Sequence, residues 1–466
     1  MKKNPWAVIL PILVLAALHT PSTAMAAPKN VILFVGDGMG FGSLTAARWF
    51  KRDLEQPGET KVENLVLHMD RLPHTAFSRT YSKNSITTDS AAAGSALLTG
   101  QKVLSGVIST QTAARGQAGS AIKTALEYAE EARKSTGVVT TTRFTHATPA
   151  ACYAHIAERN KENDIARQFV NLAATGEPGK VEVIMGGGRR HLLPNDVAGI
   201  EGKNGKRTDG RNLIGELSTH GYAIAQTQAE FNAIDGAQTD YLACFFNSSH
   251  MQYEDDRAED TAGEPSLAEM TSKAIDVLSQ NKNGYFMMVE GGRIDHALHA
   301  NNMHRVLMDT IAFDNAVKTA IDKTNAAETL IIVTSDHDHA FAFGGYASLD
   351  TPVLGSGGKD NDNLLVPMLG FGNGPGFYAH LQPVEGQPHT YKRVAYTEKQ
   401  MLEKDFLQPA AVPLDSDTHG GADVFIFAGG PWADKFRGAM NNTDIGKIMI
   451  NAFATPPSPQ KWYYKR

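Results

Sequence analysis

Seven short apolar runs, separated by longer amphipathic stretches, constrain the fold of this 466-residue chain more than any other feature. Each run is almost continuously hydrophobic, which is typical of strands that are covered on both faces. The runs are residues 30–36, 136–142, 180–186, 284–290, 329–335, 364–371 and 423–429. Helical periodicity lies between them at 119–134, 266–281 and 302–324. This alternation predicts a layered α/β fold around a large, mostly parallel sheet.

The start of the chain is typical of a secretory signal peptide. Two lysines precede an apolar run at residues 6–18, and small residues follow up to Ala26. The run is short for a membrane-spanning helix and is interrupted by Pro11, so we expect cleavage after Ala26 and no membrane anchor. The mature chain, residues 27–466, would then be periplasmic or secreted.

Composition excludes one class of partner. The formal net charge is −6, and it becomes −8 without residues 1–26, which carry two lysines and no acid. A nucleic-acid partner usually requires a basic face, so none is expected. Export permits a disulfide between Cys152 and Cys244. One lies in a predicted helix and the other in a predicted strand, however, and we expect two buried free thiols.

Residues 340–418 differ in composition from the rest of the mature chain. They are rich in Gly and Pro and lie between two polar motifs, a composition that favours turns and loops. We predict an insert with one strand of its own, serving as a lid or an interface element. Residues 187–265 are polar and weakly patterned, and the sequence does not indicate their role.

Charged motifs follow the predicted strands directly. Asp37 follows the first strand within DGMG, Glu290 ends the fourth, and Asp336 and His337 follow the fifth. His419 lies just before the last strand. Because ligands bind beyond the carboxyl ends of the strands in open α/β sheets, these groups point to one shared site.

Asp295 and His299, within EGGRIDHALH, are four residues apart. On a helix this spacing places both side chains on one face, where they can bind one metal ion. Each motif alone also fits a simple polar turn. Together, carboxylates and imidazoles with almost no cysteine favour catalytic zinc. The candidate ligands are too many for one tetrahedral ion, so two or three ions are implied. Paired metal ions are typical of enzymes that catalyse attack at phosphorus. The remaining histidines, His250 among them, fit ordinary loop or surface positions.

The stretch TTDSAAAG (87–94) places Ser90 at the start of a predicted helix. We interpret Ser90 both as the N-cap of that helix and as a nucleophile in the positive potential of its N-terminus. The stretch FTHATPAACYAHIAER (144–159) predicts another helix, with Thr148 at its start and Arg159 near its end. Thr148 is a cap or a ligand for a hard metal. Arg159 is a surface residue or a partner for two phosphate oxygens.

Taken together and in this order, the motifs DGMG, TTDSAAAG, HATPAA, VEGGRIDHALH, TSDHDHA and DTHGG resemble those of alkaline phosphatases. The resemblance covers nearly the whole mature chain. It implies a three-layer α/β/α sandwich, hydrolysis of phosphate monoesters through a phosphoserine, and a homodimer. It also implies that the insert at 340–418 is crown-like and lies at the dimer interface or over the site.

The resemblance implies a role for each motif residue. Ser90 is similar to the family's nucleophile, and Arg159 to the arginine that binds the phosphoryl oxygens. One zinc ion would be bound by Asp37, Asp336 and His337, a second zinc by Asp295, His299 and His419, and a magnesium ion by Asp37, Thr148 and Glu290.

Two positions depart from the best-known enterobacterial members, which have Asp and Lys where this chain has His146 and His296. The pattern is closer to animal and some marine bacterial members. A ligand shell that contains imidazole binds zinc or cobalt more readily than an all-oxygen shell does. These residues therefore leave open whether the third ion is magnesium, zinc or cobalt.

The preferred hypothesis is a phosphomonoesterase, with two alternatives. A diesterase or sulfatase is the first, but DSAAAG lacks the x-Pro-x-Arg context of a sulfatase nucleophile. Arg159 also favours a monoester, whose additional free oxygens need a partner. The second alternative is a phosphate- or metal-binding protein without turnover, which would not need the Ser90 hydroxyl at a helix terminus.

Overall fold

The computed structural model describes residues 26–63, 65–174, 180–387 and 390–454. The signal-peptide prediction for residues 1–26 therefore falls outside the described residues, except at Ala26 itself. Within the described residues, no helix combines the length and apolarity needed to cross a membrane.

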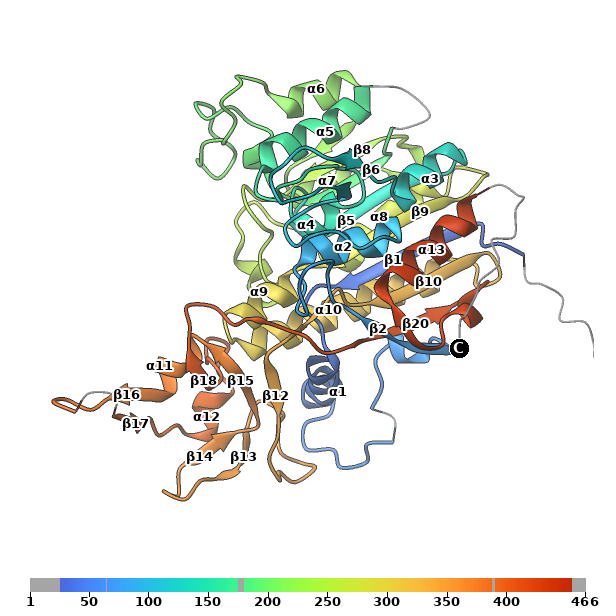
Figure 1. Ribbon diagram of the computed structural model, residues 1–466. Coiled ribbons are helices and arrows are strands. Elements are labelled where there is room, and N and C mark those ends of the chain that lie inside the picture. Colours follow the sequence, from blue (N-terminus) through green and yellow to red (C-terminus); the bar gives the residue numbers. More distant parts are fainter. Residues whose placement is uncertain (1–25, 64, 175–179, 388–389, 455–466) are drawn as a thin grey trace, which may run out of the picture.

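A ten-stranded sheet runs through the centre of the described chain (Figure 1). Its spatial order is β21 (Gly438–Asn441), β2 (His74–Arg79), β20 (Val424–Gly429), β10 (Thr329–Thr334), β1 (Asn30–Gly36), β9 (Tyr285–Gly291), β5 (Ser135–Arg143), β6 (Val183–Gly187), β8 (Leu242–Phe245) and β7 (Ala223–Ala225). β20 pairs antiparallel with both of its neighbours, and the other pairs are parallel. The predicted mostly parallel α/β sheet is confirmed.

The continuous apolar runs arise because each central strand contributes to two cores. In β1, Ile32 and Phe34 pack into one core, while Leu33 and Val35 pack into the other. Successive strand side chains point to opposite faces, so a strand with helices on both sides needs apolar residues at every position.

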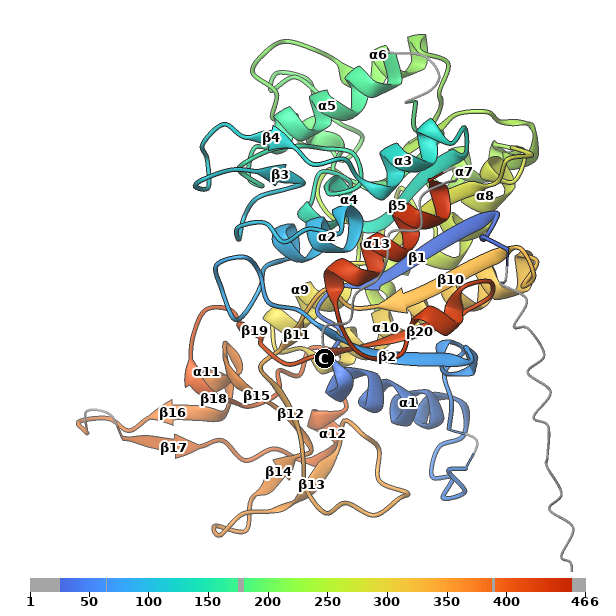
Figure 2. The ribbon, with the colours of Figure 1, turned by 45° about the vertical axis from the view of Figure 1, so that its right-hand side comes forward.

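Helices cover both faces of the sheet (Figure 2). α1 (Phe41–Glu55), α8 (Leu267–Leu278) and α10 (Met303–Lys323) supply residues to the first core. α2 (Ser90–Thr99), α3 (Ala125–Glu131), α5 (Glu162–Ala174) and α13 (Asn442–Phe453) supply residues to the second. The result is a three-layer arrangement of helices, sheet and helices.

The parallel strands bring distant motifs to one edge of the sheet. Val35 of β1 is in register with Glu290 of β9 on one side and with Thr334 of β10 on the other. Thr140 of β5 is in register with Glu290. The carboxyl ends of these strands therefore lie side by side, and the segments that follow them begin at the same place.

The insert at 340–418 contains more regular structure than the single strand expected from its sequence. It forms β12 (Phe341–Phe343), β13 (Ser356–Lys359), β14 (Leu365–Pro367), β15 (Leu369–Gly374), β16 (Leu381–Pro383), β17 (Tyr391–Arg393), β18 (Ala410–Pro413), α11 (Gly376–His380) and α12 (Glu398–Met401). β12, β15 and β18 make one small sheet, and the hairpins β13–β14 and β16–β17 extend from it. The insert projects beyond the central sheet, at the lower left of Figure 1.

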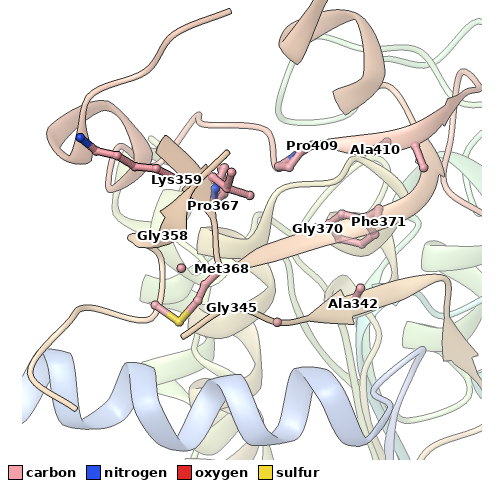
Figure 3. A pocket seen from close by; sticks show the side chains of 14 residues that line it. Ala342, Gly345, Gly358, Lys359, Pro367, Met368, Gly370, Phe371, Pro409 and Ala410 are labelled. Carbon is pink, nitrogen blue, oxygen red and sulfur yellow. The ribbon is translucent and has the colours of Figure 1, made fainter. Parts of the chain in front are cut away.

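An open pocket of about 530 Å³ lies within the insert (Figure 3). Its walls are mainly glycine and apolar side chains, including Met368 and Phe371, and Lys359 is the charged residue that lines it. None of the predicted site residues lines this pocket.

Three local predictions were wrong. The helix expected at 119–134 is confined to α3, because Ser120–Ala121 (β4) pairs with Thr110–Gln111 (β3) and Thr124 caps the helix. The strand expected at 364–371 lies in the insert, as predicted, but it is divided into β14 and β15, which belong to different small sheets. The helix expected within 144–159 is a single turn, α4 (Ala147–Ala150). In the described chain, Cys152 and Cys244 are both buried and free, as expected.

Candidate active site

Ser90 is the first residue of α2, and its neighbour Asp89 is the N-cap. The prediction that Ser90 itself caps the helix was wrong, because the Asp89 carboxylate accepts the hydrogen bond from the Ala92 N–H at 3.2 Å. This releases the Ser90 hydroxyl from capping. Its Oγ lies 3.4 Å from Nε2 of His337, at the positive end of a fully buried helix.

Asp37, Asp336 and His337 form a buried group next to Ser90, and each is fully buried. Nε2 of His337 lies 3.5 Å from Oδ1 of Asp37 and 3.3 Å from Oδ2 of Asp336. The backbone N–H of Gly38 donates to Asp336 Oδ1 at 3.0 Å. These three side chains come from the loops after β1 and β10, and their ligand atoms lie close enough to hold one cation.

Glu290 and Thr148 extend this group on its other side. Oγ1 of Thr148 donates to Asp37 Oδ2 at 3.4 Å. The hydroxyls of Thr140 and Thr142 both donate to Oε2 of Glu290. Asp37, Glu290 and His146 together form another set of atoms that can hold a cation.

Several buried carboxylate oxygens of this site have no hydrogen-bond partner within the described residues. They are Asp37 Oδ1, Glu290 Oε1 and Asp336 Oδ2. Burial, reinforced by the neighbouring carboxylates, raises the pKa of Asp37 well above its usual range. Burial also raises the pKa of Glu290 and of Asp336 to about 7. Unpaired buried oxygens are costly, and a bound cation would neutralise them.

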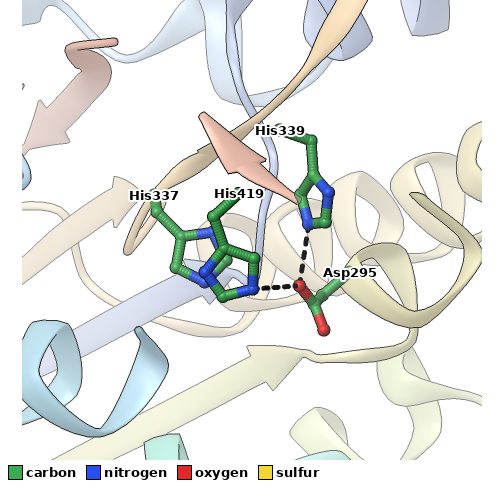
Figure 4. Close-up of side chains that lie close together, drawn as sticks. All are labelled: Asp295, His337, His339 and His419. Carbon is green, nitrogen blue, oxygen red and sulfur yellow. Dashed lines mark hydrogen bonds and ion pairs between the residues drawn. The ribbon is translucent and has the colours of Figure 1, made fainter. Parts of the chain in front are cut away.

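A second set of side chains that can hold a cation contains Asp295, His337, His339 and His419 (Figure 4), and His299 lies next to it. Asp295 and His299 lie on α9 (Arg293–His299), as their spacing predicts, with Nε2 of His299 3.4 Å from Asp295 Oδ1. Nε2 of His419 is 3.2 Å from Nε2 of His299. Nδ1 of His419 lies 2.9 Å from the carbonyl oxygen of Thr88. The ring of His419 stacks on that of His337 at 3.6 Å between centroids, so the two groups are contiguous.

The imidazoles set the charge of this second group. Burial alone would raise the pKa of Asp295, but His299, His339 and His419 hold that pKa well below its usual range. Burial lowers the pKa of His419 to about 4 and that of His337 well below its usual range. Asp295 is therefore ionised, and the rings of His337 and His419 are neutral. Carboxylates and imidazoles bind metals in these forms.

Sequence reasoning missed His339, which lies two residues after His337 in the motif SDHDH. It is buried, with Nε2 2.8 Å from Asp295 Oδ1 and Nδ1 2.9 Å from Asp417 Oδ2. Gly38, with φ +69°, lets the backbone pass close to this ring, since a Cβ there would lie 2.7 Å from its Cδ2. The signal for His339 in the sequence is the second Asp-His pair of SDHDH, which repeats the pair formed by Asp336 and His337.

Arg159 lies on the loop after α4, so the prediction that it ends a helix was wrong. Its Nη1 donates to Asp89 Oδ2 at 3.0 Å, and its Nη2 is 3.1 Å from Nε2 of His146. Asp89 also accepts from the Gly106 N–H at 3.0 Å. The guanidinium is thereby held beside the N-terminus of α2, where its fork can receive two oxygens of an anion.

His146 and His296 lie together, with ring centroids 5.5 Å apart. His250 joins them, 4.1 Å from His296 and 5.6 Å from His146. It lies on a loop, as expected, but the sequence did not indicate that its ring packs beside these two imidazoles. Nδ1 of His296 is 2.9 Å from Nη1 of Arg293. Burial lowers the pKa of His296 to about 3 and that of His146 well below its usual range, and both rings are neutral.

The site combines a serine at a helix N-terminus with contiguous groups of carboxylates and imidazoles at the edge of an α/β sheet. This combination is typical of the class of metal-dependent hydrolases. The chain belongs to the alkaline phosphatase family, because the family described as "Alkaline phosphatase" matches residues 28–455. It is accordingly an enzyme of the phosphomonoesterase type, and the resemblance found in the sequence is confirmed.

Curated relatives agree with this assignment. The chain is 36% identical over 457 residues to alkaline phosphatase from Gadus morhua, covering 91% of both chains. It is 35% identical to the human tissue-nonspecific isozyme, covering 91% of this chain and 83% of that one. Among solved structures, Thermus thermophilus alkaline phosphatase matches with a TM-score of 0.67 and 25% identity, covering 96% of this chain and 95% of that chain.

Proposed function

We propose that this enzyme hydrolyses phosphate monoesters through a phosphoserine at Ser90 and releases an alcohol and inorganic phosphate. One observation carries the proposal. The Ser90 hydroxyl lies at the N-terminus of α2, 3.4 Å from Nε2 of His337, a residue that belongs to two sets of candidate metal ligands.

The residues present fit the metals that the family uses. Buried carboxylate oxygens without partners, together with neutral imidazoles, form a donor set suited to divalent cations. Zinc would be held by Asp37, Asp336 and His337 and, in a second site, by Asp295, His299 and His419, while magnesium would be held by Asp37, Thr148 and Glu290. When bound, these ions would act as Lewis acids and lower the pKa of an oxygen that they coordinate. His146 and His296, beside the magnesium residues, would make that site tolerant of zinc or cobalt.

The side chains divide the reaction between them. Oγ of Ser90 attacks phosphorus while the bond from phosphorus to the alcohol oxygen breaks; the hydroxyl of Ser90 gives up its proton, and the leaving oxygen takes one up to become the alcohol. Water then attacks the phosphoserine and gives up a proton, the Ser90 oxygen leaves and is protonated again, and inorganic phosphate is released. The N-terminus of α2 and the fork of Arg159 bind the phosphoryl oxygens, whose charge is spread in a loose transition state. Asp89 orients Arg159 throughout.

The remaining features of the proposal concern the whole chain. We propose residues 1–26 as a cleaved signal peptide, 27–466 as one catalytic domain with its crown-like insert at 340–418, and export to the periplasm or medium. A homodimer and the absence of a nucleic-acid partner belong to the same proposal. The projecting insert supports a role at an interface.

Release of p-nitrophenol from its phosphate monoester at alkaline pH tests the proposed function. We expect activity that EDTA abolishes and that zinc plus magnesium restore. Bis-p-nitrophenyl phosphate and p-nitrophenyl sulfate serve as parallel substrates. Preference for either of them at full metal occupancy would contradict a monoesterase, and no turnover of any substrate would indicate a binding protein.

A further inference from the structure

A buried carboxylate, Asp417, lies next to the proposed metal ligands but has no part in the proposed chemistry. It is 2% exposed, whereas the flanking residues Asp415, Ser416 and Thr418 are exposed. It lies at the end of the insert, two residues before His419. A charged side chain is rarely buried unless it is paired, so its partners indicate what holds it there.

The side chain of Asp417 is one end of a buried chain of three residues. Its Oδ2 lies 2.9 Å from Nδ1 of His339, and Nε2 of His339 lies 2.8 Å from Oδ1 of Asp295. Both nitrogens of the His339 ring therefore face carboxylate oxygens, which can only accept hydrogen bonds from them. Neither nitrogen is left for a metal ion, although the ring lies among the candidate ligands.

The backbone of Asp417 holds another proposed ligand. Its carbonyl oxygen lies 2.6 Å from Nδ1 of His299, and its N–H donates to the carbonyl of His299 at 2.9 Å. A histidine that donates from Nδ1 presents Nε2 to a metal. In His299 that Nε2 is the atom nearest to Asp295 and His419.

The insert fixes the segment that carries these contacts. Oδ1 of Asn373, near the end of β15, accepts from the backbone N–H of Thr418 at 2.9 Å, and its Nδ2 donates to Oγ1 of Thr418 at 3.0 Å. Asp417 is thus held between the insert and α9 by contacts within the chain.

We infer that Asp417 is a positioning residue for the zinc site proposed at Asp295, His299 and His419. Its carboxylate orients Asp295 through His339, and its backbone orients His299. Contacts within the chain therefore orient two of the three proposed ligands. Groups that orient metal ligands in this way typically change metal affinity about 10- to 100-fold when they are removed. The inference rests on the proposed function.

The test is zinc affinity, measured by competition with a chromogenic chelator, in Asp417→Ala and Asp417→Asn. We expect Asp417→Ala to weaken binding of one zinc ion about tenfold or more. Asp417→Asn keeps the size and an acceptor oxygen, so we expect a smaller loss. It also serves as the variant with the least risk to folding. Asp415→Ala, at an exposed carboxylate two residues earlier, is the matched control and should bind zinc as the wild type does.

A double variant separates positioning from a general structural role. If Asp417 acts through His339, Asp417→Ala combined with His339→Ala should lose no more zinc affinity than His339→Ala alone. The absorption spectrum of the cobalt-substituted protein should change in Asp417→Ala and stay unchanged in Asp415→Ala.

Two outcomes would overturn the inference. Wild-type zinc affinity and cobalt spectrum in both Asp417 variants would overturn the positioning role alone. A wild-type protein that binds no zinc would overturn the proposed function, and this inference with it.

Discussion

At the scale of single residues, the site depends on which group occupies the N-cap of α2. Asp89 accepts the hydrogen bonds from Ala92 and Gly106 and the ion pair from Arg159. Ser90, one residue further on, does not cap the helix, and its hydroxyl lies at the positive end of the helix, 3.4 Å from Nε2 of His337. One carboxylate therefore stabilises the helix and orients the arginine, while its neighbour is available for chemistry.

Ser90→Ala removes the proposed nucleophile and little else. We expect kcat for p-nitrophenyl phosphate to fall at least about a thousandfold, with zinc content and Tm unchanged. Steady-state kinetics, metal analysis and thermal unfolding check this result. Ser85→Ala, at an exposed serine of the same segment, is the control. Substantial turnover in Ser90→Ala would exclude the phosphoserine.

Arg159→Ala should weaken binding of the phosphoryl group. Charge-assisted hydrogen bonds contribute about 1.5–3 kcal/mol, so we expect kcat/KM to fall roughly 10- to 100-fold and product inhibition by phosphate to weaken. Arg159→Lys keeps the positive charge but loses the two-pronged guanidinium, so its kcat/KM should lie between those of the wild type and Arg159→Ala. Arg167→Ala, at a half-exposed arginine on α5, is the control. Unchanged phosphate inhibition in Arg159→Ala would contradict the assignment.

At the scale of elements, α2 needs its cap because all ten of its residues are buried. Asp89→Ala leaves the N–H groups of Ala92 and Gly106 without their acceptor. We expect the free energy of unfolding to fall by about 1–3 kcal/mol, measured by urea denaturation. Asp89→Asn retains an acceptor and should recover most of this stability, but not the ion pair with Arg159. Equal stability losses in the two variants would argue against the cap.

The bounds of helices and strands are also where the predictions from the sequence differ from the structure. Periodicity located α8 and α10 to within a few residues, because one face of each packs on the core. It overextended α3, where Thr124 imposes a cap and the preceding residues pair as a strand. It also predicted one strand at 364–371, where the insert has two strands, β14 and β15, that pair in different small sheets.

At the scale of the whole molecule, the buried charges make the stability of metal-free protein depend on pH. Burial raises the pKa of Glu290 and of Asp336 to about 7 and that of Asp309 to about 8. These carboxyls have pKa values of about 4 in an unfolded chain. The folded state therefore holds protons that the unfolded state releases, and stability falls as pH rises through the folded-state pKa values.

Buried histidines change the stability of the metal-free protein in both directions as pH rises: one lowers it and two others raise it. Burial alone would lower the pKa of His339, but Asp295 and Asp417 raise that pKa to about 9, so its stabilisation is lost between pH about 6.5 and 9. Burial lowers the pKa of His419 to about 4 and that of His296 to about 3. Their contributions increase with pH only up to about 6.5 and are constant above it.

We therefore expect the Tm of EDTA-treated protein to fall between pH 6.5 and 9. Protein loaded with zinc and magnesium should show a smaller decrease, because bound cations stabilise the ionised carboxylates. Calorimetry of both forms across this range checks the prediction. A metal-free Tm that rises with pH would contradict the charge assignment.

The apolar runs and the order of the motifs were sufficient to predict the layered α/β class, the family and most of the residues proposed for the site, because both are local properties of the chain. They did not indicate that His339, His250 and Asp417 lie beside those residues, or that Asp89 is the N-cap of α2. These features depend on contacts between distant segments. Parallel strands bring segments together that lie far apart in the chain, such as Asp295 and Asp417. Whether a carboxylate or imidazole is a ligand, a positioning group or a cap depends on which distant atom it faces.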